Sequence, residues 1–352
     1  MHVQTSFIYA LGLALSLLGS FVSSRAPPMP VNFSSYPLTV IHEFPNPTWL
    51  ENIAVRYNGE LLVTSLTSPS LYQVDPHQTR QPLLVAEIPD SIGLLGIAEL
   101  EKDVFYVIAG KSSNSAFSFS FRSSIWKVDF REFCLEEDGT VSRPAKLSLV
   151  ADMPDTQFLN GMCRLAPNDN SALLIADSIA GSVIRLDVNT GSYNTVIKDK
   201  TMASPSPAGA LGINGIRVHG QDLFFTNFAE KTFMKMPISR VRGTAAGPAA
   251  VVINGTTGDD FILSKDGKKA WIATNFLNTL FEVHTPGQKG RIVAGGANGT
   301  DLVRATAVAF GRTWGDRNSL YVVTTGGLDS PFGGRGVTGG RVVRVDLPEN
   351  YF

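Results

Sequence analysis

The sequence of 352 residues has little charge and only two cysteines. Charged residues make up 17% of the chain, and the formal net charge is −1. Because nucleic acids and anionic membranes are bound through a concentrated basic surface, we expect neither as a partner. A dedicated zinc or copper site is not expected either, since such sites are built from clustered sulfur and imidazole ligands. Apolar residues reach 43%, which is enough for a large buried core.

Two common catalytic motifs are missing as well. The chain contains neither a G-x-S-x-G nucleophile elbow nor a G-x-x-x-x-G-K-[ST] phosphate loop. After His2, the remaining histidines are far apart in the sequence, at positions 42, 77, 219 and 284. These absences argue against a serine hydrolase and against a nucleotide-binding enzyme.

Residues 1–24 are predicted to be a signal peptide. Positions 7–18 form a run of about a dozen mostly apolar residues, which is too short to span a bilayer comfortably. Small residues follow, and the sequence Arg25-Ala-Pro-Pro then breaks any helix. We therefore expect a secreted or secretory-pathway protein, made of residues 25–352, that does not contact the membrane after cleavage. An uncleaved membrane anchor is the alternative.

A secretory route has two chemical consequences. The N-x-S/T sequons at Asn32, Asn254 and Asn298 become candidate glycosylation sites. An even cysteine count in an oxidising compartment favours a disulfide between Cys134 and Cys163. Two buried free thiols are the alternative.

One pattern recurs six times after the leader. A short apolar strand is followed by a turn, a stronger apolar strand, a polar loop and two further strands. The repeats start 44 to 65 residues apart, as four-stranded blades do. The sequence therefore predicts an all-β fold, a single six-bladed β-propeller over residues 25–352. A two-sheet sandwich is the alternative, but it does not explain the repeat.

The two ends of the repeat also fit a closed ring. The sixth repeat ends at its third strand, residues 341–346, and residues 37–44 form a spare strand before the first repeat. Pairing these two segments would close the ring and remove its free edges. We therefore predict closure by the N-terminal strand.

Aligning the repeats brings together the first residue of each innermost strand. These residues are Glu51, Leu95, Asn160, Asn214, Asp260 and Thr306. In a propeller such positions surround one mouth of the central channel, and four of them carry carboxylate or amide oxygens. Calcium and other hard divalent cations prefer such oxygens. The alternative is that Asn and Asp occur here because they favour the turns before strands.

Aromatic side chains are predicted to surround the same mouth. The loop of residues 110–124 alternates serine with Phe117, Phe119 and Phe121, and Trp49, Phe228 and Phe276 lie on neighbouring loops. We expect these six residues to bind a small apolar or aromatic substrate. The phenylalanines of the long loop could instead pack against one another in a hairpin. The glycine-rich loop of residues 326–340 is predicted to be a mobile lid.

The residues around Glu51, Asn160, Asn214 and Asp260 resemble the regucalcin/gluconolactonase superfamily of six-bladed propellers, which also includes strictosidine-synthase-like proteins. The resemblance implies that these four residues bind a divalent cation and support lactone or ester hydrolysis. One position departs from the family pattern, because Phe261 replaces the usual glycine. This bulk is expected to crowd a sugar lactone.

Within this superfamily the chain is similar to the secreted fungal hetero-Diels–Alderases of tropolonic sesquiterpenoid (meroterpenoid) biosynthesis. The shared features are the leader, one cysteine pair, the Phe-rich second-repeat loop and the Gly-rich final loop. This likeness implies a pericyclase that joins a tropolone o-quinone methide to a humulene-type sesquiterpene and needs no cofactor. Glu51, Asn160, Asn214 and Asp260 would then be the catalytic residues. A metal-dependent lactonase and a secreted, non-catalytic ligand-binding propeller are the alternatives.

Overall fold

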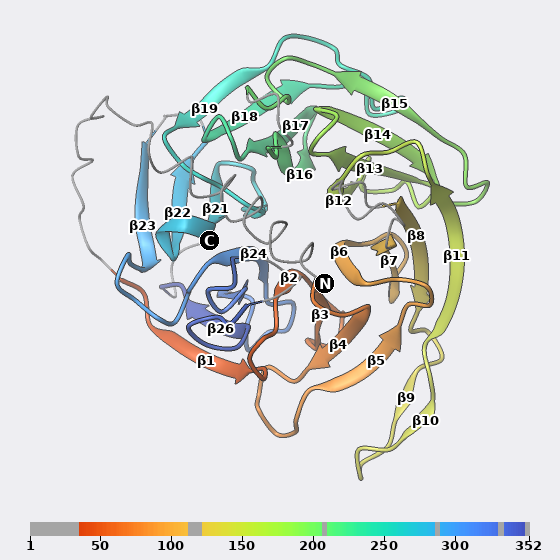
Figure 1. The fold of residues 1–352 in the computed structure, drawn as a ribbon, viewed down its shortest axis with the longest axis vertical. Helices are drawn as coiled ribbons and strands as arrows, with labels where there is room; N and C mark the ends of the chain where they lie inside the picture. Colours follow the sequence, from red (N-terminus) through yellow and green to blue (C-terminus); the bar gives the residue numbers. More distant parts are fainter. Residues whose placement is uncertain (1–34, 112–121, 206–209, 286–288, 330–333, 349–352) are drawn as a thin grey trace, which may run out of the picture.

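Four-stranded antiparallel sheets follow one another around a central axis (Figure 1). The computed structural model describes residues 35–111, 122–205, 210–285, 289–329 and 334–348. Blade 1 consists of β2 (Leu50–Val55), β3 (Leu61–Ser65), β4 (Ser70–Val74) and β5 (Leu83–Glu87). Blade 2 consists of β6 (Gly93–Glu99), β7 (Val104–Lys111), β8 (Arg122–Asp129) and β11 (Lys146–Met153), with a hairpin of β9 (Cys134–Leu135) and β10 (Val141–Arg143). Blade 3 consists of β12 (Leu159–Arg164), β13 (Ala172–Asp177), β14 (Ser182–Asp187) and β15 (Tyr193–Lys198).

The second half of the ring repeats this order. Blade 4 consists of β16 (Ile213–His219), β17 (Asp222–Asn227), β18 (Thr232–Pro237) and β19 (Ala250–Asn254). Blade 5 consists of β20 (Phe261–Leu263), β21 (Lys269–Thr274), β22 (Thr279–His284) and β23 (Lys289–Gly295), with the 3₁₀ turn η2 (Asn275–Leu277). Blade 6 consists of β24 (Ala305–Phe310), β25 (Ser319–Thr324), β26 (Arg341–Asp346) and β1 (Leu38–Glu43).

The ring is closed by strands from the two ends of the chain. β1 pairs antiparallel with β26, with Leu38 opposite Val345 and Glu43 opposite Arg341. Each innermost strand also contacts the innermost strands of the two neighbouring blades, in the order β2, β6, β12, β16, β20, β24 and back to β2. These contacts confirm the predicted six-bladed β-propeller and its closure by the N-terminal strand.

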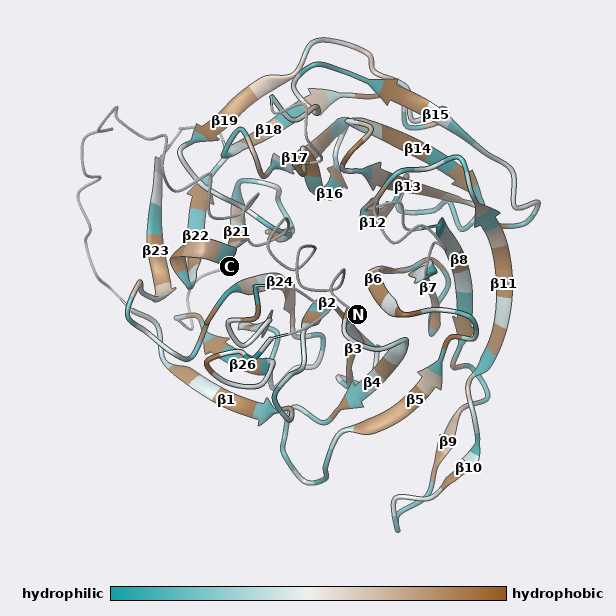
Figure 2. Cartoon of the chain, viewed as in Figure 1, coloured by the Kyte–Doolittle hydropathy of each residue, from teal (hydrophilic) through white to brown (hydrophobic). Residues whose placement is uncertain are grey.

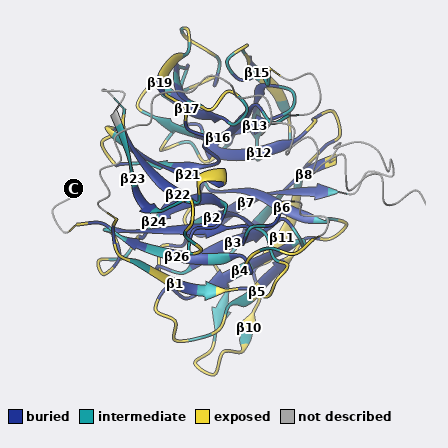
Figure 3. Cartoon of the chain, turned by 60° about the vertical axis from the view of Figure 1, so that its left-hand side comes forward, coloured by how far each residue is buried: buried dark blue, intermediate teal, exposed yellow. Residues whose placement is uncertain are grey.

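The core consists of six clusters of buried apolar side chains, each lying between two adjacent blades. Figure 2 shows the apolar residues concentrated in the strands, and the loops are largely polar. The second strand of each blade is almost fully buried, as in β3, β13 and β25, whereas outer strands such as β15 and β19 contain many exposed residues (Figure 3). This is why the second strand of each repeat is a continuous apolar run: both of its faces contact a neighbouring blade.

Glycines allow the innermost strands to lie very close together. A Cβ placed on Gly96 would lie 2.3 Å from the carbonyl oxygen of Asn160, and one placed on Gly161 would lie 2.4 Å from that of Asn214. A Cβ on Gly215 would clash with the next blade in the same way. The Asn-Gly sequence at two of the predicted site positions therefore has a packing cause beside its turn-forming one.

We expect Gly161→Ala to lower the free energy of unfolding by about 1–3 kcal/mol, because overpacking forces backbone shifts of this cost. Gly296→Ala is the matched control, since a Cβ there would meet nothing within 4 Å. Urea denaturation of both variants measures the difference. Equal stabilities would contradict the close approach of β12 and β16.

The predicted disulfide between Cys134 and Cys163 is wrong, since both cysteines are free. Cys134 lies on the hairpin strand β9, outside the sheet of blade 2, whereas Cys163 lies on β12 in the core between blades 3 and 4. Burial raises the pKa of the Cys163 thiol to about 12, so this group is an inert part of the core. An even cysteine count says nothing about whether two positions meet in space.

Several sequence predictions fall on parts of the chain about which the structure is silent. Residues 1–24, Asn32 and the three phenylalanines at positions 117, 119 and 121 lie outside the described residues. Asn254 and Asn298 are exposed, as a glycosylated asparagine must be, and their modification stays a prediction. Within the described ranges, no helix has the length and apolar character that crossing a membrane requires.

Candidate functional site

The candidate site lies where the innermost strands begin, and bulges shape it. In blades 1, 3 and 4, pairing of the innermost strand with its neighbour is interrupted at the predicted site residue: between Leu50 and Asn52, Leu159 and Met162, and Ile213 and Ile216. A bulge interrupts the alternation of side chains and re-aims them. We call this end of the ring, which carries Glu51 and Asp259, the carboxylate end.

Glu51 is a predicted site residue whose pKa is strongly raised. Its side chain is only 6% exposed, and the indole Nε1 of Trp49 donates a hydrogen bond of 2.6 Å to its Oε2. Burial raises the pKa of Glu51 to about 7, the Trp49 hydrogen bond opposes the shift, and the negative charge of Asp260 adds to it. Near neutral pH, Glu51 is therefore present in both its protonated and its ionised form.

Asp260 occupies the predicted position, but its carboxylate is already engaged. Its Oδ2 accepts hydrogen bonds from Asn52 Nδ2 at 2.9 Å and from the Arg217 guanidinium at 3.0 Å. Its Oδ1 accepts from the backbone N–H of Phe261 at 2.7 Å. Asp260 thus links blade 5 to blades 1 and 4 through these hydrogen bonds.

The neighbouring Asp259 is a site residue that sequence reasoning missed. It is buried, accepts a hydrogen bond of 3.1 Å from Asn275 Nδ2, and is also hydrogen-bonded by the side chain of Asn214. Burial raises the pKa of Asp259 well above its ordinary value, and the negative charge of Glu51 adds to this shift. The two adjacent aspartates in the sequence could have indicated this second site residue, but alignment of the repeats selected Asp260 alone.

Amide side chains lie at the same end of the ring as these carboxyl groups. Asn160 and Asn214 lie on the bulges of β12 and β16, and both are almost fully buried. Asn275, in η2, connects Asp259 to the Arg304 guanidinium through a contact of 3.5 Å. The arrangement places amide hydrogen-bond donors and two carboxyl groups with raised pKa values at one end of the ring.

Two of the predicted aromatic residues form part of a rim beside this site. The rings of Phe228 and Phe276 are 5.5 Å apart, and the Arg304 guanidinium lies 4.7 Å from the centre of the Phe276 ring. Phe276 is 39% exposed and Trp49 is half-buried beside Glu51. The structure therefore places three predicted substrate-binding residues, Trp49, Phe228 and Phe276, at the carboxylate end.

Phe261 does not crowd the site, contrary to the expectation from sequence. Its side chain is fully buried between blades 4 and 5, where its ring lies 4.7 Å from that of Phe233. It fills the core and leaves the carboxylate end free. Phe261 therefore does not crowd a sugar lactone, and that prediction is wrong.

The four residues of the regucalcin-like set do not fit a resident divalent cation. A cation bound at Asp260 would be repelled by the guanidinium of Arg217, which lies 3.0 Å from the carboxylate. In the part of the chain that the structure describes, no group of three or more His, Cys, Asp or Glu side chains could hold a metal ion. We therefore derive no chemical step through a metal.

The shifted pKa of Glu51 predicts how stability depends on pH. Folding raises this pKa from an ordinary 4.5 to about 7, so the folded state binds the proton more tightly. The contribution of Glu51 to stability is then fully present below pH 4.5 and is lost as the pH rises through about 7. We expect Glu51→Gln to gain stability relative to the wild type between about pH 5 and about pH 8, as measured by urea denaturation.

Glu137→Gln, which changes an exposed glutamate, is the control and should show no such trend. If the stability difference between Glu51→Gln and the wild type does not change over this pH range, the raised pKa of Glu51 is contradicted.

Two known proteins are similar to this chain along most of its length. A protein from Phoma sp. named "Putative hetero-Diels-Alderase" is 29% identical over 344 residues, covering 91% of this chain and 95% of that protein. A protein of the same name from Sarocladium schorii is 28% identical over 323 residues, covering 81% and 77%. No protein-family model matches the chain.

Solved structures support the fold. A calcium-binding regucalcin from Agrobacterium tumefaciens superposes with a TM-score of 0.57 at 18% identity, covering 89% of this chain and 96% of that one. At this identity the likeness concerns the architecture alone. The chain is therefore a six-bladed propeller with the regucalcin fold that is similar, along most of its length, to proteins named as hetero-Diels-Alderases.

Proposed function

We propose that this protein is a pericyclase that catalyses a hetero-Diels–Alder cycloaddition, joining a tropolone o-quinone methide to a humulene-type sesquiterpene. The similarity to two proteins named as hetero-Diels-Alderases supports the reaction type. The observation at the site that carries the proposal is the buried Glu51 carboxyl, held by Trp49 and able to keep a proton near neutral pH. The two substrates are proposed from the resemblance described for the sequence.

The proposed reaction needs few catalytic groups. The o-quinone methide supplies a four-atom heterodiene that ends in its carbonyl oxygen, and the terpene supplies a carbon–carbon double bond. One C–C bond and one C–O bond form in the same step, while π bonds are consumed and rearranged. No group leaves, no net proton is transferred, and no oxidant or reductant is consumed. The absence of a nucleophile elbow in the sequence is compatible with this chemistry.

Glu51 acts as a hydrogen-bond donor in the proposal. Its protonated form donates to the quinone-methide carbonyl, which withdraws electron density from the heterodiene and lowers the barrier to cycloaddition. Trp49 fixes one carboxyl oxygen, so that the other is directed to the substrate. The side-chain amides of Asn160 and Asn214 add donors in surroundings of low polarity, where such donors are strongest.

The aromatic rim takes the apolar partner. Phe228 and Phe276 offer an apolar surface next to the polar site, on which a macrocyclic hydrocarbon can be held against the heterodiene. Holding two reactants in a near-attack arrangement can lower the barrier by about 7–11 kcal/mol without any proton transfer. In this proposal, the polar side chains of Glu51, Asn160 and Asn214 activate the heterodiene. The aromatic rim orients the hydrocarbon partner.

The decisive experiment generates the o-quinone methide in solution with humulene and compares the adducts formed with and without the purified protein. We expect a faster reaction and a single dominant stereoisomer, and we expect a chelator to change neither. A product ratio equal to that of the uncatalysed reaction would instead favour a ligand-binding role. Lactone turnover that a chelator abolishes would favour the metal-dependent hydrolase.

A further inference from the structure

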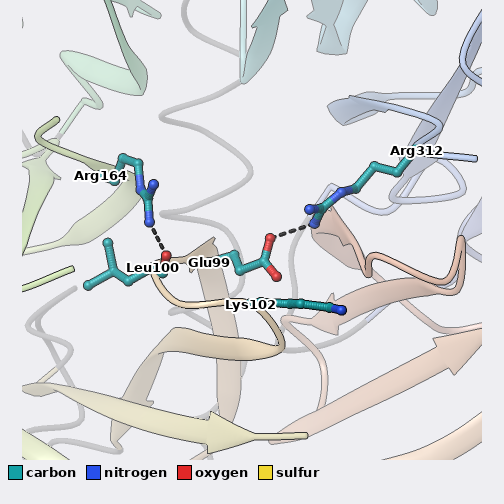
Figure 4. A pocket seen from close by; sticks show the side chains of 5 residues that line it. All are labelled: Glu99, Leu100, Lys102, Arg164 and Arg312. Carbon is teal, nitrogen blue, oxygen red and sulfur yellow. Dashed lines mark hydrogen bonds and ion pairs between the residues drawn. The ribbon is translucent and has the colours of Figure 1, made fainter. Parts of the chain in front are cut away.

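A second polar site lies at the opposite end of the ring. A cavity of about 360 Å³ is lined by Glu99, Leu100, Lys102, Arg164 and Arg312, whose side chains are drawn in Figure 4. Glu99 and Arg164 are the last residues of β6 and β12, and Arg312 follows β24. The carboxylate end, in contrast, is formed where the innermost strands begin. We call this second end, where β6, β12 and β24 finish, the arginine end.

The carboxylate end and the arginine end are too far apart for one small ligand to contact both. An innermost strand of six residues separates them, which corresponds to roughly 15–20 Å at about 3.3 Å per residue. None of the residues proposed for the cycloaddition lines the cavity at the arginine end. A ligand bound there is therefore not a substrate in contact with Glu51.

The cavity carries more positive than negative charge. Arg312 donates to Glu99 Oε2 at 2.5 Å and to the carbonyl oxygen of Val55 at 2.8 Å. The other Glu99 oxygen accepts from the backbone N–H of Asp103. Both oxygens of Glu99 are therefore engaged, and of the three cationic side chains that line the cavity Glu99 forms an ion pair with Arg312 alone.

Arg164 has no carboxylate partner among the described residues. Its guanidinium donates to the carbonyl oxygens of Leu100 and Pro167 and to Asn170 Oδ1, all of which are neutral. Its Nε is buried without a hydrogen-bond partner in the described structure. Burial lowers the pKa of Arg164, and the negative charges of Glu99 and Asp169 oppose this shift without cancelling it.

Lys102 is the third cation, and it too is not neutralised. Its ammonium group lies 3.7 Å from the centre of the Tyr57 ring, in a cation–π contact that leaves its charge intact. No ion pair joins Lys102 to a carboxylate in the described part of the chain. Two uncompensated cations therefore face one cavity in a protein whose formal net charge is −1.

We propose that the arginine end binds a small dianion through Lys102, Arg164 and Arg312. Guanidinium groups match the geometry of carboxylate and phosphate oxygens, so the ligand is a dicarboxylate or a phosphate monoester. The cavity volume suits a small metabolite and lies at the lower end of the range for ligand pockets. This site is separate from the proposed cycloaddition and does not depend on it.

Isothermal titration calorimetry of the full chain with succinate, and separately with inorganic phosphate, tests the proposal. We expect at least one anion to bind with a Kd of about 1 mM or lower at low ionic strength, and to bind more weakly as salt is added. Lys102→Met should weaken binding about fivefold or more, because it removes one of two uncompensated charges. The stronger of the two anions identifies the carboxylate or the phosphate class.

Lys268→Met is the charge-matched control. Lys268 is also exposed, but it pairs with Asp266 on blade 5 and does not line the cavity. Binding that Lys268→Met leaves unchanged and Lys102→Met weakens supports the site. The proposal is overturned if neither anion binds, or if both variants weaken binding equally, since equal losses indicate attraction by the overall surface charge.

Discussion

Replacing Glu51 by alanine is expected to slow the cycloaddition by about 100- to 1,000-fold, the usual cost of removing one preorganised donor to a developing negative charge. Glu51→Gln is expected to keep most of the rate, because its amide N–H can also donate a hydrogen bond. The wild-type rate should fall as the pH rises through about 7, where Glu51 loses its proton. The rate of Glu51→Gln should be independent of pH in this range. Initial rates of adduct formation measure all three effects.

The pair of variants distinguishes the competing functions. A hydrolase that uses Glu51 as a base or as a metal ligand requires the carboxylate, so its activity would rise with pH and would be lost in Glu51→Gln. Phe276→Leu serves as a comparison, since it changes the aromatic rim and leaves the acid group in place. This variant should alter the stereoisomer ratio more than the pH profile. A Glu51→Gln variant as inactive as Glu51→Ala would show that hydrogen-bond donation is not the role of Glu51.

Asp103→Asn is expected to lower the free energy of unfolding by about 3 kcal/mol or more, because it leaves a buried guanidinium without its counter-ion. Arg56 and Asp103 form two parallel hydrogen bonds of 3.0 Å, and their side chains are only 6% and 7% exposed. Arg56 also donates to Gln73 Oε1 at 2.9 Å and lies over the Phe130 ring. Asparagine is chosen because Asp103 has a φ of 59°, which asparagine tolerates and alanine does not.

Urea denaturation measures this effect, and two further variants interpret it. The double variant Arg56→Met with Asp103→Asn should be more stable than Asp103→Asn alone, because the unpaired charge is then gone. Glu132→Gln breaks an exposed ion pair with Lys146 and should leave stability unchanged within error. If Asp103→Asn and Glu132→Gln are equally mild, the buried pair does not stabilise the interface between blades 1 and 2.

The architecture could be predicted because it depends on features that repeat along the chain. Six similar units and a spare strand at residues 37–44 were sufficient to predict the ring and its closure, and β1 pairs with β26 as expected. The first residues of the innermost strands could be grouped at one end for the same reason. Of the predicted rim, Phe228 and Phe276 do lie in contact.

The details of the site could not be predicted, because they depend on bulges and on contacts between blades. Alignment of the repeats selects one residue per blade and does not indicate which of two adjacent carboxylates lies beside Asn214 and Asn275, so Asp260 was favoured over Asp259. The guanidinium that engages Asp260 comes from Arg217, 43 positions earlier in the sequence. Similarly, Phe261 was expected in the channel but fills the core between blades 4 and 5.

By itself, the sequence determined the number of blades, the way the ring closes, and the end of the ring where oxygen-bearing side chains gather. Local hydrophobic patterns and the spacing of repeats carry this information. Only the tertiary structure decided that Cys134 and Cys163 remain apart, that burial raises the pKa values of Glu51 and Asp259, and that a cationic cavity lies at the opposite end. These features depend on burial and on distances between residues far apart in the chain, which no local pattern records.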